Sequence, residues 1–380
     1  MRFPSLSLVL AGSALALLLS GGCRKQDNTV IKIGEFASLT GKEAAFGQSS
    51  HKGTLLAVEN ANAAGGVLGK KIELLTEDNE TKQGESATIA KKLISRDQVV
   101  ALLGEVASTR SLEAAPICQA EKIPMISPSS TNPAVTQTGD YIFRVCFIDS
   151  FQGAAVAKFA WNTLKLRHIA VLTSVSSAYS VGLAKYFKEG FAAVGGDVVL
   201  EQKYAEGDKD FKAQLTAIKA AGVDGLFVPG YYTEAALVCI QARELGLQFP
   251  IFGGDGWEAP ELLTIGGAAM EGCYYTTHYS PENQAPVVQD FVRSFQARFG
   301  GETPDSMAAL GFDSARVLLD AIRRAGTPEG GALRAAIAAT RDFPGVTGTT
   351  TLDAERNATK AITVITIKHG QFQFVENIAP

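Results

Sequence analysis

The alternation of short apolar strands with amphipathic helices is the feature that most limits the fold of this chain. The predicted strands of the first half are residues 30–37, 70–80, 99–105 and 123–129. The predicted helices between them are residues 47–66, 84–97 and 108–121. No Asn-Gly or Asp-Gly hairpin signal joins these strands. The pattern therefore predicts an α/β fold, with a parallel sheet covered by helices on both faces.

The same pattern repeats in the second half of the chain. Its predicted strands are residues 168–174, 197–204, 223–230 and 249–255. Its predicted helices are residues 180–196, 210–222 and 232–246. Two more helices, 286–300 and 305–326, precede an antiparallel hairpin over 359–376 with its turn at His369-Gly370. Two similar α/β lobes in succession are the simplest interpretation.

The N-terminus has a different character. Arg2 precedes an apolar run from Leu6 to Leu19, which is too short to span a membrane and predicts a signal peptide over residues 1–22. The small residues before Cys23 resemble a bacterial lipobox, which predicts cleavage before Cys23 and lipidation of its thiol. Ser20 stands where a lipobox usually has leucine, so ordinary cleavage without a lipid stays an alternative. Either route predicts a location in the periplasm or at the cell surface, with a lipid anchor in the first case.

Composition excludes several classes of function. The chain has 380 residues and a formal charge of -4, without a basic cluster, so we expect no nucleic-acid partner. Beyond Cys23, the cysteines form no C-x-x-C pair and lie in apolar contexts, so we interpret them as small buried side chains and predict no metal site. They are Cys118, Cys146, Cys239 and Cys273, and a Cys118–Cys146 or Cys239–Cys273 bridge stays open.

Catalytic motifs are missing from the sequence. No G-x-G-x-x-G follows the first strand, and neither a G-x-x-x-x-G-K-[ST] loop nor a G-x-S-x-G elbow occurs. We therefore predict a protein that is not an enzyme, with no catalytic residue and no cofactor.

Polar residues gather where the predicted strands end, and ligands of open α/β sheets bind there. In the first half, Ser108 and Thr131 follow two such strands and precede a helix or turn. Hydroxyls and free backbone N–H groups at a helix start suit a carboxylate, although plain N-capping, contributing about 1 kcal/mol, is the alternative. In the second half, Asp255 could be a turn residue or could pair with an ammonium group, with Tyr179 and Tyr231 as aromatic walls. A carboxylate site facing an ammonium site describes an amino acid.

Three motifs carry a resemblance over nearly the whole chain after the signal peptide: "LTG" at 39–41, "NAAGGVLGKKIELLTED" at 62–78 and "ISPSSTNP" at 126–133. Together they resemble the branched-chain amino acid ABC transporter substrate-binding proteins, the type I periplasmic binding proteins similar to leucine/isoleucine/valine-binding protein. The resemblance implies two Rossmann-like lobes with parallel sheets and three hinge crossings. Lobe 1 would be residues 29–144 plus 276–358, and lobe 2 residues 145–275 plus 359–380.

The resemblance also implies the ligand contacts. The carboxylate and ammonium of an amino acid would meet Val106, Ala107, Ser108, Ser129 and Thr131. Asp255 would bind the ammonium, where relatives often have glutamate. Tyr179, Tyr231 and Phe46 would surround the side chain. A first-lobe disulfide of some relatives is not supported, because its positions are Glu80 and Ala107 here. Glu105 and Trp257 receive no role.

The implied function is that of an extracytoplasmic solute-binding protein of an ABC importer. It would bind a small L-amino acid of branched-chain type in a cleft between the lobes, act as a monomer and deliver the ligand to a membrane permease. A ligand sensor or regulator of the same fold that binds an amide or an aromatic acid is the alternative.

Overall fold

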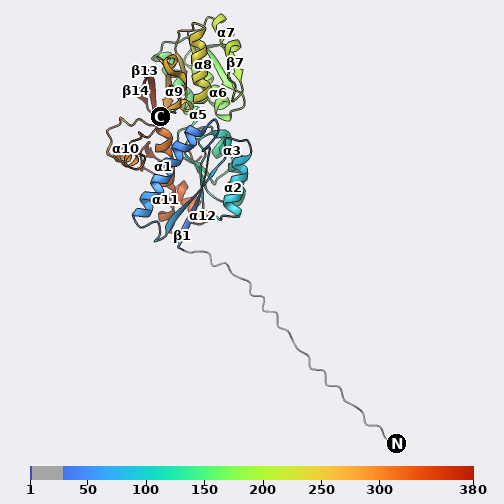
Figure 1. The fold of residues 1–380 in the computed structure, drawn as a ribbon, viewed down its shortest axis with the longest axis vertical. Helices are drawn as coiled ribbons and strands as arrows, with labels where there is room; N and C mark the ends of the chain where they lie inside the picture. The colour runs from blue at the N-terminus through green and yellow to red at the C-terminus, as the bar shows by residue number, and fades with distance from the viewer. Residues whose placement is uncertain (2–28) are drawn as a thin grey trace.

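The computed structural model describes Met1 and residues 29–380, which form two lobes stacked along the long axis of the molecule (Figure 1). The predicted signal peptide and Cys23 lie outside the described residues. Among the residues described, no helix is both long and apolar enough to cross a membrane.

The first lobe contains a five-stranded sheet in the order β2-β1-β3-β4-β5, and every neighbouring pair is parallel. Its strands are β1 (Val30–Ala37), β2 (Lys71–Asp78), β3 (Leu102–Leu103), β4 (Met125–Ser127) and β5 (Ile142–Arg144). Its helices are α1 (Ala44–Ala63), α2 (Glu85–Ser95), α3 (Ser108–Glu121), α4 (Ala134–Gln137), α10 (Pro286–Arg298), α11 (Ser306–Ala325) and α12 (Gly330–Ala338). A small hairpin joins β11 (Phe343–Gly345) to β12 (Gly348–Thr350).

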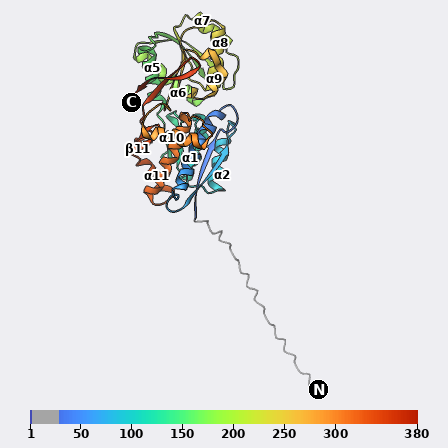
Figure 2. The same cartoon turned by 60° about the vertical axis from the view of Figure 1, so that its left-hand side comes forward.

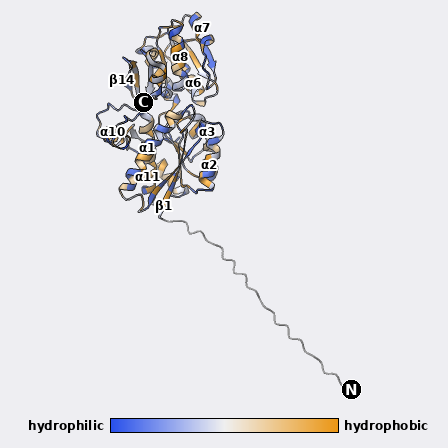
Figure 3. Cartoon of the chain, viewed as in Figure 1, coloured by the Kyte–Doolittle hydropathy of each residue, from blue (hydrophilic) through white to orange (hydrophobic). Residues whose placement is uncertain are grey.

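Successive residues of these strands point to opposite faces of the sheet. Leu102 and Met125 belong to the apolar cluster under α2 and α3. Their neighbours Leu103 and Ile126 belong to the cluster under α1 and α11. Both faces of the sheet are therefore buried, which explains why its strands read as continuous apolar runs. Figure 3 shows hydrophobic residues (orange) on helices of both lobes, including α8 and α11.

The second lobe contains a seven-stranded sheet in the order β14-β13-β10-β9-β8-β6-β7. Its strands are β6 (His168–Ser174), β7 (Asp197–Tyr204), β8 (Gly225–Phe227), β9 (Ile251–Gly253), β10 (Tyr274–Thr277), β13 (Ile362–Lys368) and β14 (Gln371–Ile378). The five adjacent strands β7, β6, β8, β9 and β10 are parallel to one another. Strand β13 pairs antiparallel with both β10 and β14. The predicted α/β class, with mainly parallel sheets and a C-terminal hairpin, is confirmed.

The helices of the second lobe are α5 (Asp149–Asn162), α6 (Ala178–Ala193), α7 (Lys212–Ala220), α8 (Tyr232–Glu244) and α9 (Glu261–Gly266). Short 3₁₀ turns cover Asp255–Trp257 (η1) and Gly267–Met270 (η2). The sequence pattern did not predict α5, which packs on α6. More than half of α5 is buried, including Gln152 and Gly153, so it lacks the broad polar face that marks an amphipathic helix.

Within residues 29–380, three segments connect the lobes: 145–148, 278–285 and 351–361. Figure 2 shows the C-terminal strands (red) returning to the upper, second lobe after the α10–α12 region of the lower one. The predicted division into lobes stays a prediction. Its boundary between residues 275 and 276 falls inside β10, whose four residues all pair with β13, so strand pairing favours a boundary after Thr277.

Candidate functional site: a cavity between the lobes

One cavity brings together side chains from both lobes at the carboxyl ends of the parallel strands. Seven of the nine ligand residues predicted from the sequence line it: Phe46, Val106, Ser108, Ser129, Tyr179, Tyr231 and Asp255. Gly256 and Met307 complete the lining. The free volume is only about 10 Å³, roughly enough for one water molecule. An amino acid could therefore enter only if the lobes part and the lining side chains move.

The predicted residues Ala107 and Thr131 do not line this cavity. The backbone N–H of Ala107, at the start of α3, donates to Glu105 Oε2 at 2.7 Å. Ser38 N–H donates to the other oxygen of Glu105, also at 2.7 Å. Glu105 is 1% exposed, and burial raises the pKa of its carboxyl. Glu105, which received no role from the sequence pattern, thus stabilises the first-lobe loop without lining the cavity.

The hydroxyl run after β4 divides into two kinds of residue. Ser127 Oγ and Ser130 Oγ both donate to the Glu105 carbonyl oxygen, at 2.7 and 2.8 Å, so they shape the turn. Ser129 instead lines the cavity. Thr131 Oγ1 is buried and has no hydrogen-bond partner among the described residues. One short loop therefore contains hydroxyls that shape the turn and a hydroxyl that faces the cavity.

Aromatic rings form the second-lobe wall. Tyr179 and Tyr231 stack with 5.3 Å between ring centroids and 5° between planes. Phe46, from the first lobe, meets Tyr231 edge-on at 5.3 Å. Burial raises the pKa of both phenols well above the ordinary value, so they stay neutral. This aromatic part of the lining is thus apolar except for two hydroxyl groups.

Asp255 follows β9 in the short turn η1. Its flanking glycines are required by the close approach of Tyr179. A Cβ at Gly254 would lie 2.5 Å from the Tyr179 hydroxyl oxygen, and one at Gly256 would lie 2.8 Å from the same ring. The Gly256 N–H donates to that hydroxyl at 3.0 Å. The glycines therefore bring the acid and the aromatic ring together, which a turn alone does not require.

Side chains that the sequence analysis missed surround Asp255. Gln152 Nε2 donates to Asp255 Oδ1 at 2.9 Å, and His278 Nε2 lies 3.0 Å from Oδ2. Asp149 is fully buried, and burial, reinforced by the charge of Asp255, raises the pKa of its carboxyl well above the ordinary value. No local sequence pattern marks these three residues. Trp257, by contrast, is a core residue that donates to the Val228 carbonyl at 3.0 Å.

The lobes also contact each other around the cavity. Lys42 Nζ forms an ion pair with Glu206 at 2.9 Å, and the Tyr232 hydroxyl donates to the Lys42 carbonyl at 2.9 Å. On another side, Asn132 Nδ2 donates to the Ala178 carbonyl at 2.7 Å. These bonds join first-lobe loops to α6, α8 and the loop after β7, so the cavity is closed by direct interlobe contacts.

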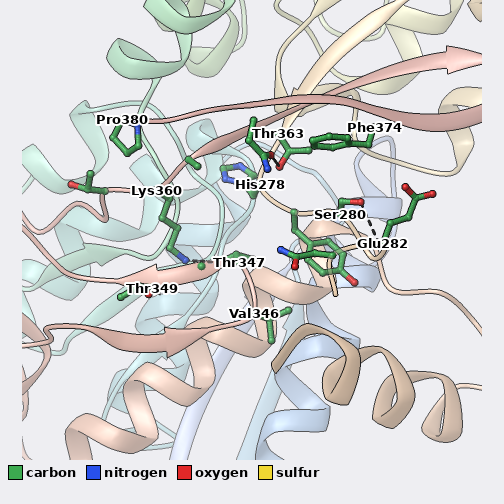
Figure 4. A pocket seen from close by; sticks show the side chains of 16 residues that line it. His278, Ser280, Glu282, Val346, Thr347, Thr349, Lys360, Thr363, Phe374 and Pro380 are labelled. Carbon is green, nitrogen blue, oxygen red and sulfur yellow. Dashed lines mark hydrogen bonds between the residues drawn. The ribbon is translucent and has the colours of Figure 1, made fainter. Parts of the chain in front are cut away.

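A larger cavity, here called the hinge pocket, lies among the interlobe connections (Figure 4). Its volume is about 550 Å³, and His278, Thr347, Lys360 and Thr363 are among its lining residues. None of the nine predicted ligand residues lines it. Lys360 is buried there and donates to Thr347 Oγ1. The sequence-predicted site is therefore the smaller cavity.

Over the described part of the chain, no three His, Cys, Asp or Glu side chains are grouped as a metal site requires. The four cysteines in this part are free and buried, as the sequence indicated. Cys239 Sγ and Cys273 Sγ lie 3.8 Å apart as thiols.

Comparison with known proteins agrees with this architecture. The family model "Periplasmic binding protein" matches residues 30–371. The leucine-, isoleucine-, valine-, threonine-, and alanine-binding protein of Pseudomonas aeruginosa is 32% identical over 298 residues, which cover 78% of this chain and 79% of that protein.

Solved structures give the same result. The leucine binding protein LivK of Thermotoga maritima is 40% identical with a TM-score of 0.89, over 92% of this chain and 99% of that chain. The branched-chain amino acid transporter substrate binding protein LivJ of Streptococcus pneumoniae, in complex with isoleucine, is 33% identical with a TM-score of 0.87, over 92% of this chain and 100% of that chain. Membership of this family implies a location outside the cytoplasm. The chain belongs to the periplasmic binding protein family, among the branched-chain amino acid ABC transporter substrate-binding proteins.

Proposed function

We propose that this protein captures a small L-amino acid of branched-chain type between its lobes and delivers it to the permease of an ABC importer. The observation that carries the proposal is the composition of the interlobe cavity. Hydroxyl groups and a helix start from the first lobe face an acid and aromatic rings from the second.

In this proposal the first-lobe wall binds the ligand carboxylate. Ser108 is the first residue of α3, where backbone N–H groups lack partners within the helix and the helix dipole favours an anion. Ser129 adds a hydroxyl and Val106 lines the same wall, whereas Ala107, whose N–H binds Glu105, and Thr131 support the loops without lining the cavity. Hydrogen bonds to a charged carboxylate are about twice as strong as those between neutral groups.

The second-lobe wall binds the other end of the ligand. Asp255 accepts from the ammonium, while Tyr179, Tyr231 and Phe46 surround an aliphatic side chain. A ligand that touches both walls binds the closed arrangement better than the open one, so it shifts the equilibrium toward closure. The protein thus acts by binding and closure, without a catalytic step.

The proposal includes the setting of the protein. A monomer tethered to the membrane by a lipid on Cys23 would present the closed lobes to the permease. Export and lipidation are supported by the N-terminal sequence, and the extracytoplasmic location by the family.

Calorimetric titration tests the function. The full chain is unfolded and refolded to remove any bound ligand and is then titrated with single L-amino acids. We expect binding of leucine, isoleucine or valine, with basic and acidic amino acids excluded. Binding of amides or aromatic acids in place of any amino acid would contradict the proposal and favour the sensor alternative.

A further inference from the structure

Both carboxylate oxygens of Asp255 accept hydrogen bonds from side chains on other elements of the chain. Gln152 in α5 donates to Oδ1, and His278, directly after β10, donates to Oδ2. Asp255 and His278 are 3% and 4% exposed, and Gln152 is not exposed at all. Two N–H groups therefore fix the orientation of the one buried acid in the lining of this cavity.

The orientation of Gln152 is determined by its partners. Its Nε2 donates both to Asp255 Oδ1 and to Thr276 Oγ1, which is 3.0 Å away on β10. A carboxylate only accepts hydrogen bonds, so the nitrogen and not the oxygen of this amide must face Asp255. One amide thus links α5, β10 and the turn that carries Asp255.

The ring of His278 is fixed in the same way. It stacks on Phe147 with 3.7 Å between centroids, and its Nε2 also lies 3.5 Å from Ser129 Oγ. Its Nδ1 is buried without a hydrogen-bond partner in residues 29–380. Burial lowers the pKa of the imidazole, which favours a neutral ring with its proton on Nε2. His278 also lines the hinge pocket (Figure 4), while its Nε2 contacts Asp255 and Ser129, which line the interlobe cavity.

We infer that Gln152 and His278 are positioning residues that make this cavity specific for ligands with an α-ammonium group. A carboxylate has about four lone-pair sites; these two donors occupy one on each oxygen, and the Tyr179 hydroxyl also interacts with Asp255. The remaining sites are left for the N–H donors of a ligand in the cavity that Asp255 lines. The inference rests on the proposed function and extends it to residues that do not line the cavity.

The position of these residues strengthens the inference. Gln152 lies in the first turn of α5, after the connection 145–148, and His278 begins the connection 278–285. Asp255 is therefore held in part by residues next to two of the interlobe connections. Its geometry is set by long-range contacts, and a ligand meets an acid already oriented for it.

The experiment compares L-leucine with 4-methylpentanoate, which has the same carbon skeleton without the amino group. His278→Phe keeps a flat ring against Phe147 and removes the donor, and Gln152→Glu replaces the donor by an acceptor. We expect each variant to bind L-leucine about tenfold to a hundredfold more weakly, the effect of a hydrogen bond to a charged group. The affinity for 4-methylpentanoate, measured by its competition with L-leucine, should change less than threefold (about 0.6 kcal/mol).

His51→Phe is the matched control. His51 Nδ1 also contacts a buried carboxylate, Glu35 Oε2, at 2.6 Å, but it does not line the cavity. This variant should bind both ligands as the unmodified protein does. Equal losses for the two ligands in His278→Phe, or an equal loss of L-leucine binding in His51→Phe, would overturn the inference and leave a purely structural role.

A second measurement needs no ligand. Nitrogen-15 NMR of the imidazole in the full chain reports which ring nitrogen of His278 carries the proton. We expect protonation of Nε2 and a clear shift of this signal in Asp255→Asn. Protonation of Nδ1 in place of Nε2, or an imidazole signal that is unchanged in Asp255→Asn, would overturn the inference even if L-leucine binds. Failure of the unmodified protein to bind any amino acid would instead contradict the proposed function.

Discussion

The two walls of the interlobe cavity are built in different ways. On the first-lobe wall, Ser108 begins α3 shortly after β3 and Ser129 lies in the loop after β4, and neighbouring hydroxyls and backbone groups hold these segments. On the second-lobe wall, Asp255 depends on Gln152, 103 positions away, and on His278, 23 positions away. The loops after two neighbouring strands of one sheet thus supply neutral donors for a carboxylate, whereas the single acid that lines the cavity is oriented by α5 and by the segment after β10. We expect the second wall to be the more sensitive to substitution.

Asp255→Asn should have the largest effect. The change keeps the shape of the side chain but removes the charge that faces the ligand ammonium, so L-leucine binding should weaken by about 2–4 kcal/mol, or roughly 30-fold to 1000-fold. Calorimetry measures the loss. Asp224→Asn, at an acid that binds the backbone of residues 167–168 in the same lobe, is the control and should bind normally. Equal affinity of Asp255→Asn and the unmodified protein for L-leucine would show that Asp255 does not bind the ligand.

Glu43, which directly precedes α1, makes the stability of the protein depend on pH. Burial, then the charges of Glu105 and Glu206, raises the pKa of the Glu43 carboxyl from 4.5 to about 8. Between these values the folded protein binds more protons than the unfolded chain, so this carboxyl lowers stability as pH rises through the window.

Glu43→Gln removes that proton-binding group. The variant should melt at least about 3 °C above the unmodified protein at pH 8.5, a shift that about 1 kcal/mol produces in a chain of this size. The two proteins should converge near pH 5. Thermal unfolding followed by circular dichroism measures the difference, and parallel pH profiles of the two proteins would contradict a raised pKa.

On the first-lobe wall, Ser129→Ala should weaken L-leucine binding by about 1 kcal/mol, or roughly fivefold, because one hydroxyl among several donors is lost. Ser127→Ala is the matched comparison in the same loop. Since Ser127 binds the Glu105 carbonyl, its loss should lower the melting temperature more than the affinity. The reverse ranking, with Ser127→Ala the weaker binder, would show that the loop and not its cavity-facing hydroxyl governs binding.

The smallest effect is expected for Lys42→Ala. The ion pair with Glu206 crosses the lobes, but the Lys42 side chain is 34% exposed and solvent screens it. Ligand affinity should fall by less than about 1 kcal/mol, and the difference should shrink in high salt. A loss as large as that of Asp255→Asn would mean that closure depends on the rim and not on the ligand contacts.

The fold could be predicted from the sequence because its strands and helices carry local signals. Strands buried on both faces read as apolar runs, and Gly65 and Gly66 end α1 with positive φ angles of 100° and 83°. The features that the sequence did not predict share one cause: they depend on contacts between segments and carry no local pattern. Helix α5 is buried over most of its surface, and its 14 residues show no broad polar face. The antiparallel pairing of β13 with β10 depends on a tertiary contact between distant segments.

The residues of the candidate site also differ in how well the sequence predicts them. Hydroxyls after strands and an acid between glycines are visible in the sequence, and the cavity contains Ser108, Ser129 and Asp255 together. Gln152 and His278 gave no signal, because their importance arises only when α5 and the segment after β10 meet Asp255. Sequence patterns therefore identify residues that contact a ligand more readily than residues that orient those contacts.

The most direct test of the central claim is calorimetric titration of the unmodified protein with three ligands: L-leucine, 4-methylpentanoate and isopentylamine. These share a carbon skeleton but carry both charged groups, the carboxylate alone or the ammonium alone. If the two walls hold opposite ends of one amino acid, L-leucine should bind at least about a hundredfold more tightly than either partial ligand. Equal binding of 4-methylpentanoate and L-leucine would contradict the account, because the Asp255 wall would then contribute nothing to recognition.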